Sequence, residues 1–566
     1  MDSQKRENLL NMALDATPKE RMESAALGTG YDFEERTWEL IVRCSGDLTP
    51  LREMGVQVKE LLGGYAVLKA FEGLVDEITR LPQILYMEKP KLLYFAVNGG
   101  RSASCLTKVQ SGGLGLTGAG VLVAVIDSGI DYFHQDFRKE DGTTRILELW
   151  DQEKGIYSQE QINEALRAGT RQEGLQIVPS VDLSGHGTAV AGIAAGNGRE
   201  SGGLYRGVAW ESPLLVVRLG AASPGNFPRT TQLMEAMDYV VRKAGELSMP
   251  AAVNLSFGNT YGSHDGTSLL ETFLDTAADN GRMVVCVGTG NEGTAGGHVS
   301  GRLEEGREKR VELSVAEYET EFSIQLWKSY TDEFDIVLVT PSGQESGPVS
   351  RHLGLQTFRY GRTRVLLYYG EPKPYSPAQE IYFLFQPEED YVDSGIWTIR
   401  LIPGRLVTGE YQLWLPSQSA LNPATRFLAS TPDGTLTIPS TARGVISVGA
   451  YNDSYQSYAA FSGRGLLDQR GGNKPDLAAP GVDIVTARAG GGYEAVTGTS
   501  FAAPFVTGSG ALMMEWGILQ GNDPYLYGEK VKAYLRRGAR QLPGFDAFPN
   551  PQVGYGALCV ADSLPS

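Results

Sequence analysis

A short, wholly apolar segment, residues 123–126, ends at Asp127 and is followed at once by a Ser-Gly turn. Continuous apolar runs of this length are typical of parallel strands that are buried on both faces. Open α/β sheets carry their functional sites at the carboxyl ends of such strands, so Asp127 is expected at a functional edge. The segment therefore predicts an α/β fold built around a parallel sheet.

Two later segments are rich in small residues, and each begins at a polar side chain. His186 precedes residues 187–196, which are mostly Gly and Ala, and Ser500 precedes a second run of this kind at residues 501–508. Small residues suit helices that pack closely on a sheet. A hydroxyl at the start of a helix lies at the positive end of the helix dipole, which favours the negative charge that develops during nucleophilic attack.

These residues supply the parts of a peptide hydrolase. Ser500 would attack the scissile carbonyl, His186 would take its proton and pass it to the leaving amine, and Asp127 would fix the imidazole tautomer. The order Asp, His, Ser along the chain is that of subtilisin. Taken singly, each residue has a structural alternative. Asp127 could be a turn or helix cap at a strand end, His186 could be a structural histidine, and the Gly-Thr-Ser that contains Ser500 is a common tripeptide. Their joint occurrence in this order argues against a chance match.

Five further segments, at residues 126–137, 253–258, 287–293, 445–450 and 474–481, resemble subtilase sequence blocks in subtilase order. The resemblance implies that the Asn291 side-chain amide joins the Ser500 backbone N–H in holding the tetrahedral oxyanion. The structural alternative for Asn291 is a loop residue that turns a strand into a Gly-rich bend. The resemblance also implies that a substrate backbone pairs with an enzyme strand. The substrate-binding residues are then expected to be Ser256, Phe257, Gly258, Gly288, Thr289 and Gly290.

The length of 566 residues is too great for one core and predicts several domains. The interval from His186 to Ser500 is longer than a compact catalytic domain needs, and between them the pattern changes to short strands without helices. These strands are expected at residues 310–315, 322–327, 334–339, 364–369, 381–385, 397–402 and 411–415. Such a segment predicts an inserted β-sandwich or jelly-roll-like domain over residues 297–428. The catalytic domain would comprise residues 98–296 and 429–566.

Residues 1–97 show an α+β pattern that includes a helix at 71–81 and a strand at 84–88. A unit of this size ahead of a subtilase resembles the family's prodomain, which acts as an intramolecular chaperone and as a bound inhibitor. A strand-forming segment at residues 91–97 would pair with the strand at 256–258 and present a bond to Ser500. Autocleavage is expected near Ala96, Val97 and Asn98, and the alternative is an ordinary interdomain linker.

This architecture resembles the Csp-type subtilases of clostridia. The resemblance implies an active serine endopeptidase that activates a cell-wall hydrolase precursor during spore germination. The alternative is a catalytically silent sensor or scaffold of the same fold, which usually lacks a triad residue, whereas this chain keeps all three. A further hypothesis is that aromatic residues of the insertion stack on sugars instead of forming its core. These are Trp327, Tyr330, Tyr368, Tyr369, Tyr382, Trp397 and Trp414.

Composition and charge limit the classes of partner that this chain is expected to bind. A net charge of −17 opposes nucleic-acid binding, and no apolar stretch is long enough to predict a membrane span. The partners expected are a protein or peptide substrate and the prodomain. No Sec-type signal peptide is seen, and the four scattered cysteines are expected to be free thiols in a reducing compartment. We therefore expect a cytoplasmic or spore-associated protein of a clostridium-like bacterium.

No cofactor and no metal are expected. Asp136 resembles a subtilase position that binds calcium, an ion that takes six to eight oxygen ligands. The partner loop at residues 197–204 departs from the family's calcium loop because it carries Arg199. A structural calcium ion is therefore compatible with the sequence but not expected.

Overall fold

The computed structural model of this protein describes residues 3–91, 94–95, 104–110, 114–220, 227–349, 351, 354–374, 376–466 and 473–565. The chain forms two compact units, each with its own core. The first comprises Met1–Tyr94, Asn259–Leu269 and Thr294–Ile438, and the second comprises Phe95–Gly258, Leu270–Gly293 and Pro439–Ser566. Among the described residues, no helix combines the length and the hydropathy that a membrane span requires.

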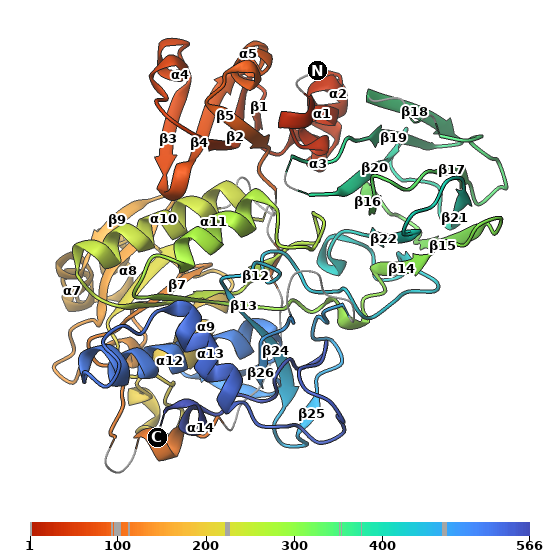
Figure 1. The fold of residues 1–566 in the computed structure, drawn as a ribbon. Coiled ribbons are helices and arrows are strands. Elements are labelled where there is room, and N and C mark those ends of the chain that lie inside the picture. Colours follow the sequence, from red (N-terminus) through yellow and green to blue (C-terminus); the bar gives the residue numbers. More distant parts are fainter. Residues whose placement is uncertain are drawn as a thin grey trace. The chain divides into compact units, whose positions relative to one another are not determined.

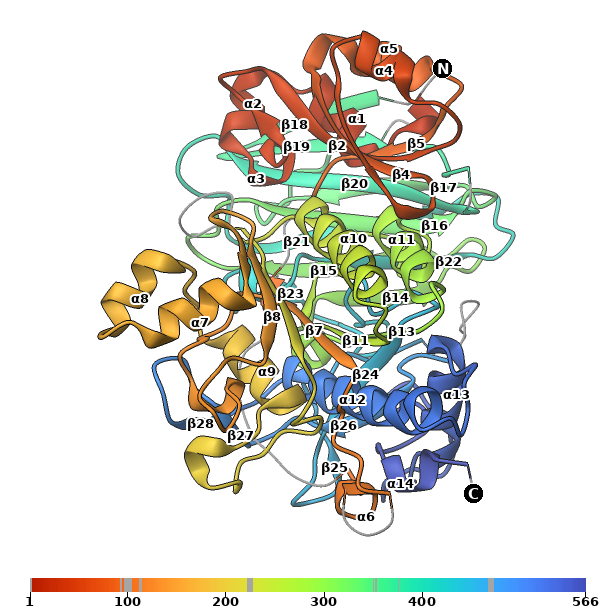
Figure 2. The ribbon, with the colours of Figure 1, turned by 90° about the vertical axis from the view of Figure 1, so that its left-hand side faces the viewer.

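The second unit is built on a large sheet whose central strands are parallel. The strand order is β25-β24-β13-β11-β7-β10-β8-β9, with β26 beside β24. Figures 1 and 2 show α10 (Thr230–Glu246) and α11 (Leu269–Ala278) on one face of this sheet and α9 (His186–Ala195), α12 (Thr499–Met514) and α13 (Gly528–Gly538) on the other. The predicted α/β fold is thereby confirmed. The strands are β7 (Leu122–Asp127), β8 (Ile146–Asp151), β9 (Gly155–Ser158), β10 (Leu214–Arg218), β11 (Ala251–Leu255), β13 (Met283–Gly288), β24 (Ile446–Asn452), β25 (Ser457–Tyr458) and β26 (Leu477–Pro480).

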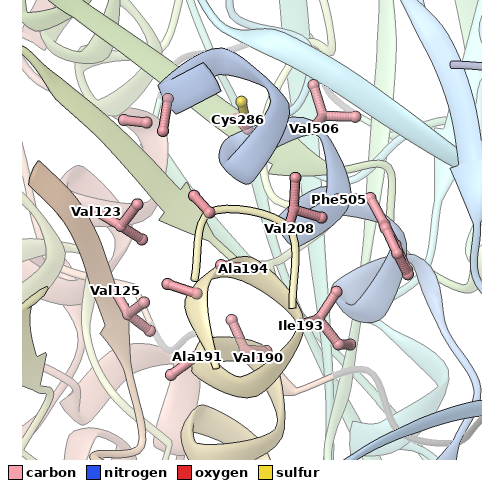
Figure 3. Packing of buried hydrophobic residues seen from close by; sticks show 14 of the residues in the cluster. Val123, Val125, Val190, Ala191, Ile193, Ala194, Val208, Cys286, Phe505 and Val506 are labelled. Atoms are coloured by element: carbon pink, nitrogen blue, oxygen red, sulfur yellow. The ribbon is translucent and has the colours of Figure 1, made fainter. Parts of the chain in front are cut away.

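Glycine permits close packing around α9 and α12. A Cβ atom at Gly192 of α9 would lie 2.5 Å from the Oγ1 atom of Thr486, which is in β27 (Ile484–Ala487). One at Gly508 of α12 would lie 2.5 Å from the Cβ atom of Val208 and 2.8 Å from the carbonyl oxygen of Ala194. Figure 3 shows the apolar core around these contacts, with side chains from β7, α9 and α12. The small residues therefore have the role expected of them.

Cys105 and Cys559 form a disulfide, with their Cα atoms 4.9 Å apart. The prediction that all the cysteines are free thiols is wrong for this pair, whereas Cys44 and Cys286 are free and buried. The two bonded cysteines stand 454 residues apart in the sequence. They precede α6 (Leu106–Gln110) and α14 (Val560–Ser563), two short helices that pack together only in the folded chain.

The N-terminal part of the first unit has the predicted α+β character. Its antiparallel sheet has the strand order β1-β2-β4-β3, with β5 beside β2. The helix expected at residues 71–81 is shorter than predicted, because a 3-10 turn over Glu72–Leu74 precedes α5. The strands are β1 (Tyr31–Asp32), β2 (Thr37–Cys44), β3 (Gln57–Leu61), β4 (Tyr65–Phe71) and β5 (Ile84–Glu88). The helices are α1 (Asn8–Asp15), α2 (Pro18–Glu23), α3 (Ala25–Gly28), α4 (Thr49–Glu53) and α5 (Val75–Arg80).

The inserted segment folds as two antiparallel sheets, ordered β14-β22-β16-β20-β19-β18 and β17-β21-β15-β23. Side chains from both sheets form one core, which makes the segment a β-sandwich, while jelly-roll connectivity stays a prediction. The predicted strands are confirmed as β15 (Lys309–Val315), β16 (Phe322–Ser329), β17 (Phe334–Val339), β19 (Thr363–Tyr369), β20 (Ala378–Pro387), β21 (Gly395–Pro403) and β22 (Glu410–Trp414). The sequence analysis missed β14 (His298–Arg302), β18 (Gly354–Tyr360) and the very short β23 (Arg426–Phe427).

Strands β19 and β20 are buried on both faces. Leu367 and Phe383 belong to the sandwich core, whereas the neighbouring residues Leu366 and Leu384 join the core that contains Leu10 of α1. Because successive side chains of a strand point to opposite faces, the sheet separates two apolar layers. This explains why residues 364–369 are largely apolar instead of alternating with polar residues.

The aromatic side chains of the insertion are mostly core residues. Tyr330 is exposed, with 55% of its surface accessible. The other candidates for sugar stacking are buried, namely Trp327, Tyr368, Tyr369, Tyr382, Trp397 and Trp414. Tyr369 and Trp397 belong to the sandwich core, and Tyr368 and Tyr382 to the core that contains Leu10. Their burial leaves the six side chains no surface on which a sugar could stack.

A thiol titration tests the disulfide. Protein purified and denatured without reductant should expose two reactive thiols, Cys44 and Cys286, and reduction should raise the number to four. Cys559→Ser should lower the free energy of unfolding by about 2–5 kcal/mol, because the disulfide no longer restrains the unfolded chain. The control Cys44→Ser should remove one thiol and leave the disulfide intact. Four thiols before reduction would contradict the pairing.

Candidate active site

Asp127 and His186 meet at the carboxyl edge of the parallel sheet. Asp127 ends β7 and is completely buried, and its Oδ1 atom lies 2.7 Å from Nδ1 of His186. The same carboxylate oxygen accepts a hydrogen bond from the Ser128 backbone N–H at 2.7 Å. The contact between Asp127 and His186 favours the imidazole tautomer with its proton on Nδ1, so that Nε2 can accept a proton.

Ser500 lies in the first turn of α12, immediately before a residue that contacts this imidazole. The ring of Phe501, the next residue, has its centroid 5.2 Å from that of His186. The Ser500 hydroxyl donates to the Ser256 carbonyl oxygen at 3.2 Å, and the Ser256 hydroxyl donates to the Ser500 carbonyl oxygen at 2.9 Å. The nucleophile candidate is thus at the positive end of a helix dipole and tied to the predicted substrate strand.

Asn291 follows β13, and its side-chain amide is fixed by Thr499. Its Oδ1 atom accepts hydrogen bonds from the Thr499 backbone N–H at 3.1 Å and from the Thr499 hydroxyl at 3.2 Å. The Thr499 hydroxyl in turn accepts from the Gly290 N–H at 3.0 Å. Because Oδ1 is occupied, the amide nitrogen is the end of the side chain that remains to donate. The residue before Ser500 therefore orients the predicted oxyanion donor, a role that the sequence analysis missed.

The predicted substrate residues have different surroundings. Ser256, Phe257 and Gly258 are buried, and Phe257 places its ring centroid 6.4 Å from that of His186. Thr289 is completely buried, and its hydroxyl lies 3.2 Å from that of Ser462, so its side chain holds the loop. A substrate contact by Gly288, Thr289 or Gly290 stays a prediction.

The substrate strand has a partner within the chain. β12 (Phe257–Gly258) forms a two-stranded sheet with β6 (Tyr94–Phe95), of which Phe95 belongs to the same unit. The expected pairing of the strand at 256–258 with the segment at 91–97 is confirmed for this strand. The predicted cleavage region, Ala96, Val97 and Asn98, lies outside the described residues.

Asp182 is a buried acid near the site that the sequence analysis also missed. Its Oδ1 atom accepts from the Gly185 N–H at 2.9 Å and from the hydroxyls of Ser128 at 2.8 Å and Ser184 at 3.3 Å. Its Oδ2 atom accepts from the N–H and the hydroxyl of Thr188 at 2.8 and 2.6 Å. Asp182 thus satisfies the free amides at the start of α9 and ties that helix to the residue after Asp127.

Asp136 is occupied by protein donors. Its two oxygens each lie 2.9 Å from the Tyr493 hydroxyl, and Oδ1 also accepts from the Glu200 N–H at 3.0 Å. Arg199 of the partner loop donates to the Lys139 carbonyl oxygen. Across the part of the chain that the structure describes, no three His, Cys, Asp or Glu side chains gather as a metal site requires. In this structure protein hydrogen bonds from Glu200 and Tyr493 engage the Asp136 carboxylate.

Family models match most of the chain. The Subtilase family model matches residues 118–357 and 425–556. The chain belongs to the subtilase family. The Csp protease B prodomain model matches residues 4–91, and the interruption between the two subtilase matches falls within the inserted β-sandwich.

Individual relatives support this assignment. The structure of the CspB protease of Clostridium perfringens matches with a TM-score of 0.77 and 37% sequence identity, covering 81% of this chain and 95% of that one. Minor extracellular protease Vpr of Bacillus subtilis is 25% identical over 477 residues, which cover 80% of this chain and 53% of Vpr. Serine protease AprX of Bacillus subtilis is 34% identical over 157 residues, which cover 24% of this chain and 33% of AprX. This subtilase therefore spans about half the length of Vpr and a third of that of AprX.

Asp182→Ala should lower kcat of the subtilase about 100-fold with little change in KM, because small displacements of the catalytic base are costly. Asp182→Asn keeps one acceptor oxygen and should recover part of the loss. Asp141→Ala, a control at an exposed turn whose carboxylate accepts from the Thr143 N–H, should leave kcat unchanged. An effect of Asp182→Ala on thermal stability alone, with wild-type kcat, would reduce the role of Asp182 to helix capping.

Asn291→Ala should lower kcat about 10²–10³-fold, as removal of one oxyanion donor does elsewhere. Asn291→Asp is the sharper variant, since it keeps an oxygen to accept from Thr499 but removes the donor. Both variants should bind substrate with a KM close to that of the wild type. Steady-state kinetics on a peptide substrate measure both constants, and an unchanged kcat in either variant would remove Asn291 from the oxyanion site.

Proposed function

We propose that this subtilase is a serine endopeptidase whose nucleophile, base and orienting acid are Ser500, His186 and Asp127. The supporting observation is the 2.7 Å contact between His186 Nδ1 and the fully buried Asp127 carboxylate. Ser500 lies in the first turn of α12, and the ring centroid of the next residue, Phe501, lies 5.2 Å from that of the same imidazole. Burial keeps water from competing for the carboxylate, so the imidazole retains its orientation.

In the proposed reaction the Ser500 Oγ atom bonds to the scissile carbonyl carbon while its proton passes to His186 Nε2. Negative charge moves to the carbonyl oxygen, where the Asn291 amide and the Ser500 N–H would stabilise it. As the C–N bond breaks, the imidazolium returns the proton to the leaving amine. Water then releases the acyl group by the same steps, with His186 again as the base.

We also propose that the chain cleaves itself between its prodomain and its catalytic domain. The support is the pairing of β6 with β12, because a strand added there would carry the following residues toward Ser500. Cleavage near Ala96, Val97 or Asn98 would leave the prodomain as a bound inhibitor. The match of residues 4–91 to a Csp protease prodomain is consistent with that role.

The physiological substrate proposed is the precursor of a cell-wall hydrolase that is activated in spore germination. This rests on the resemblance to Csp-type subtilases, with which the 37% identity to the CspB protease of Clostridium perfringens is consistent. The proposed location is cytoplasmic or spore-associated. Since disulfides are rare in reducing cytoplasm, Cys105–Cys559 favours the spore-associated alternative. Incubation with such a precursor should yield a shortened product with the wild type and none with Ser500→Ala.

Ser500→Ala tests the chemistry and the self-cleavage together. It should lower kcat on the order of 10⁶-fold and leave the chain uncut, whereas the wild type should show two fragments by intact mass spectrometry. Ser509→Ala is a matched control on α12, where the buried Ser509 hydroxyl donates to the Phe505 carbonyl oxygen. The control should cleave itself and react with a fluorophosphonate probe as the wild type does.

The second candidate, a silent sensor or scaffold, predicts different results. A wild-type chain that ignores a fluorophosphonate probe, while a known subtilase reacts, would favour it. Cleavage that persists in Ser500→Ala would instead identify another protease as the agent. Retention of the buried Asp–His contact argues for the enzyme, because a silent protein has no need of it.

A further inference from the structure

A polar pocket of about 330 Å³ lies in the second unit, apart from the predicted substrate strand. Its walls come from the loop after β7, the loop after α9, the start of α8 (Arg171–Ile177) and the turn between β27 and β28 (Tyr493–Val496). The charged side chains that line it are Asp131, Arg138, Arg171, Arg199 and Glu200. Three arginines in one pocket are notable in a chain with a net charge of −17.

The pocket's acidic side chains are already engaged. Asp131 pairs through both oxygens with Arg171, at 2.9 and 3.1 Å, and accepts from the Gly490 N–H at 2.7 Å. Glu200 accepts from the Gly492 N–H at 2.8 Å. Asp131 therefore has its own cation in Arg171, whereas Glu200 holds the turn and places Oε2 3.5 Å from Nε2 of His134.

Arg138 and Arg199 are the remaining cations of the pocket. Arg138 donates to the Phe133 carbonyl oxygen and Arg199 to the Lys139 carbonyl oxygen. Within the described ranges neither guanidinium has a carboxylate within 4.0 Å, and the buried Nε atom of Arg138 has no hydrogen-bond partner. Each guanidinium therefore keeps donors that no protein acceptor uses.

Arg138 and Arg199 line the same pocket, so their like charges repel each other. A bound anion would offset this repulsion. Guanidinium groups recognise carboxylate and phosphate oxygens through paired hydrogen bonds.

We propose that the pocket lined by Arg138 and Arg199 binds an oxyanion, either a carboxylate or a phosphate group. The volume accommodates such a group together with part of the molecule that carries it. Two sources share this chemistry, namely an acidic side chain of the protein substrate and a free small anion. The idea that a substrate side chain supplies the anion rests on the proposed function, whereas the proposal that the pocket binds an anion does not.

The pocket shares its framework with the candidate active site. Asp131 follows Asp127 by four residues, and its backbone N–H donates to the hydroxyl of Thr188 in α9 at 2.9 Å. Ala489, in the turn beside the pocket, lies 3.6 Å from the position that a Cβ atom of Gly185 would occupy, immediately before His186. An anion held here would therefore contact the same loops that position the catalytic residues.

Thermal unfolding of the full chain in inorganic phosphate, with ionic strength held constant by chloride, tests the site. The wild-type melting temperature should rise with a saturable dependence on phosphate, since ligand binding to the folded state stabilises it. In the Arg138→Gln/Arg199→Gln double variant the apparent Kd should weaken at least about tenfold. Arg206→Gln, a charge-matched control on the loop after α9 whose guanidinium stacks on Trp210, should respond as the wild type does. An equal response in all three proteins would be the general effect of an excluded salt and would overturn the proposal.

The single variant Arg199→Gln controls for misfolding of the double variant, because Arg199 is exposed whereas Arg138 is partly buried. This variant should also weaken phosphate binding, and wild-type binding in it would overturn the proposal. Peptide pairs that differ only by Glu or Gln near the scissile bond distinguish the two sources. If the substrate supplies the anion, the wild type should prefer the Glu peptide. The ratio of kcat/KM for the Glu peptide to kcat/KM for the Gln peptide should then fall toward one in the double variant. If the ratio is unchanged while phosphate binding is lost, a free anion is the ligand.

Discussion

The candidate site depends on how closely α9 and α12 pack in the second unit. Gly508 meets Val208 and the backbone of α9 at distances that leave no room for a side chain, and Gly192 does the same at β27. His186 begins one of these helices and Ser500 lies in the first turn of the other, so their separation is set by the packing beneath them. Any side chain at Gly508 would push the helices apart and move the imidazole away from the hydroxyl. The core is dense enough that such a shift would not be absorbed locally.

Polar residues next to the candidate catalytic residues complete this arrangement. Asp182 binds the start of α9 and Ser128, while Thr499 holds the Asn291 side chain. In each case a buried side chain satisfies backbone amides that would otherwise lack partners, which is costly in an apolar interior. The same bonds restrict the positions of Asp127, His186 and the oxyanion donor. Stability of the loops and geometry of the site are therefore obtained from one set of interactions.

The first unit shows how an insertion can be joined to another segment. Side chains of β19 and β20 alternate between the sandwich core and the core that includes the N-terminal helix α1. Because this sheet is buried on both faces, removal of either apolar layer would expose side chains of the sheet to water. The two layers therefore stabilise each other. Leu366 and Leu384 would be solvent-exposed if the N-terminal part departed, which gives a physical reason for it to remain bound after a cut in the chain.

Much of the fold was predictable from local sequence. The apolar run that ends at Asp127 specifies a buried parallel strand, and the Gly- and Ala-rich segments specify close-packed helices. All seven strands predicted for the insertion are present. The omissions were β14, β18 and β23, and in the N-terminal part the 3-10 turn ahead of α5 shortened a predicted helix. Short strands carry too few residues to establish a periodicity, and an edge strand can keep polar residues on both faces.

The sequence by itself determined the family, the order Asp127, His186, Ser500 and the identity of Asn291, because the chemistry demands these residue types next to these local structures. Only the tertiary structure decided that Cys105 bonds Cys559, that Asp182 and Thr499 orient the candidate catalytic groups, and that Arg138 and Arg199 share a pocket. These are contacts between segments that are distant in the chain or joined by irregular loops. Their distances depend on how whole elements pack, and neither periodicity nor spacing along a chain records that.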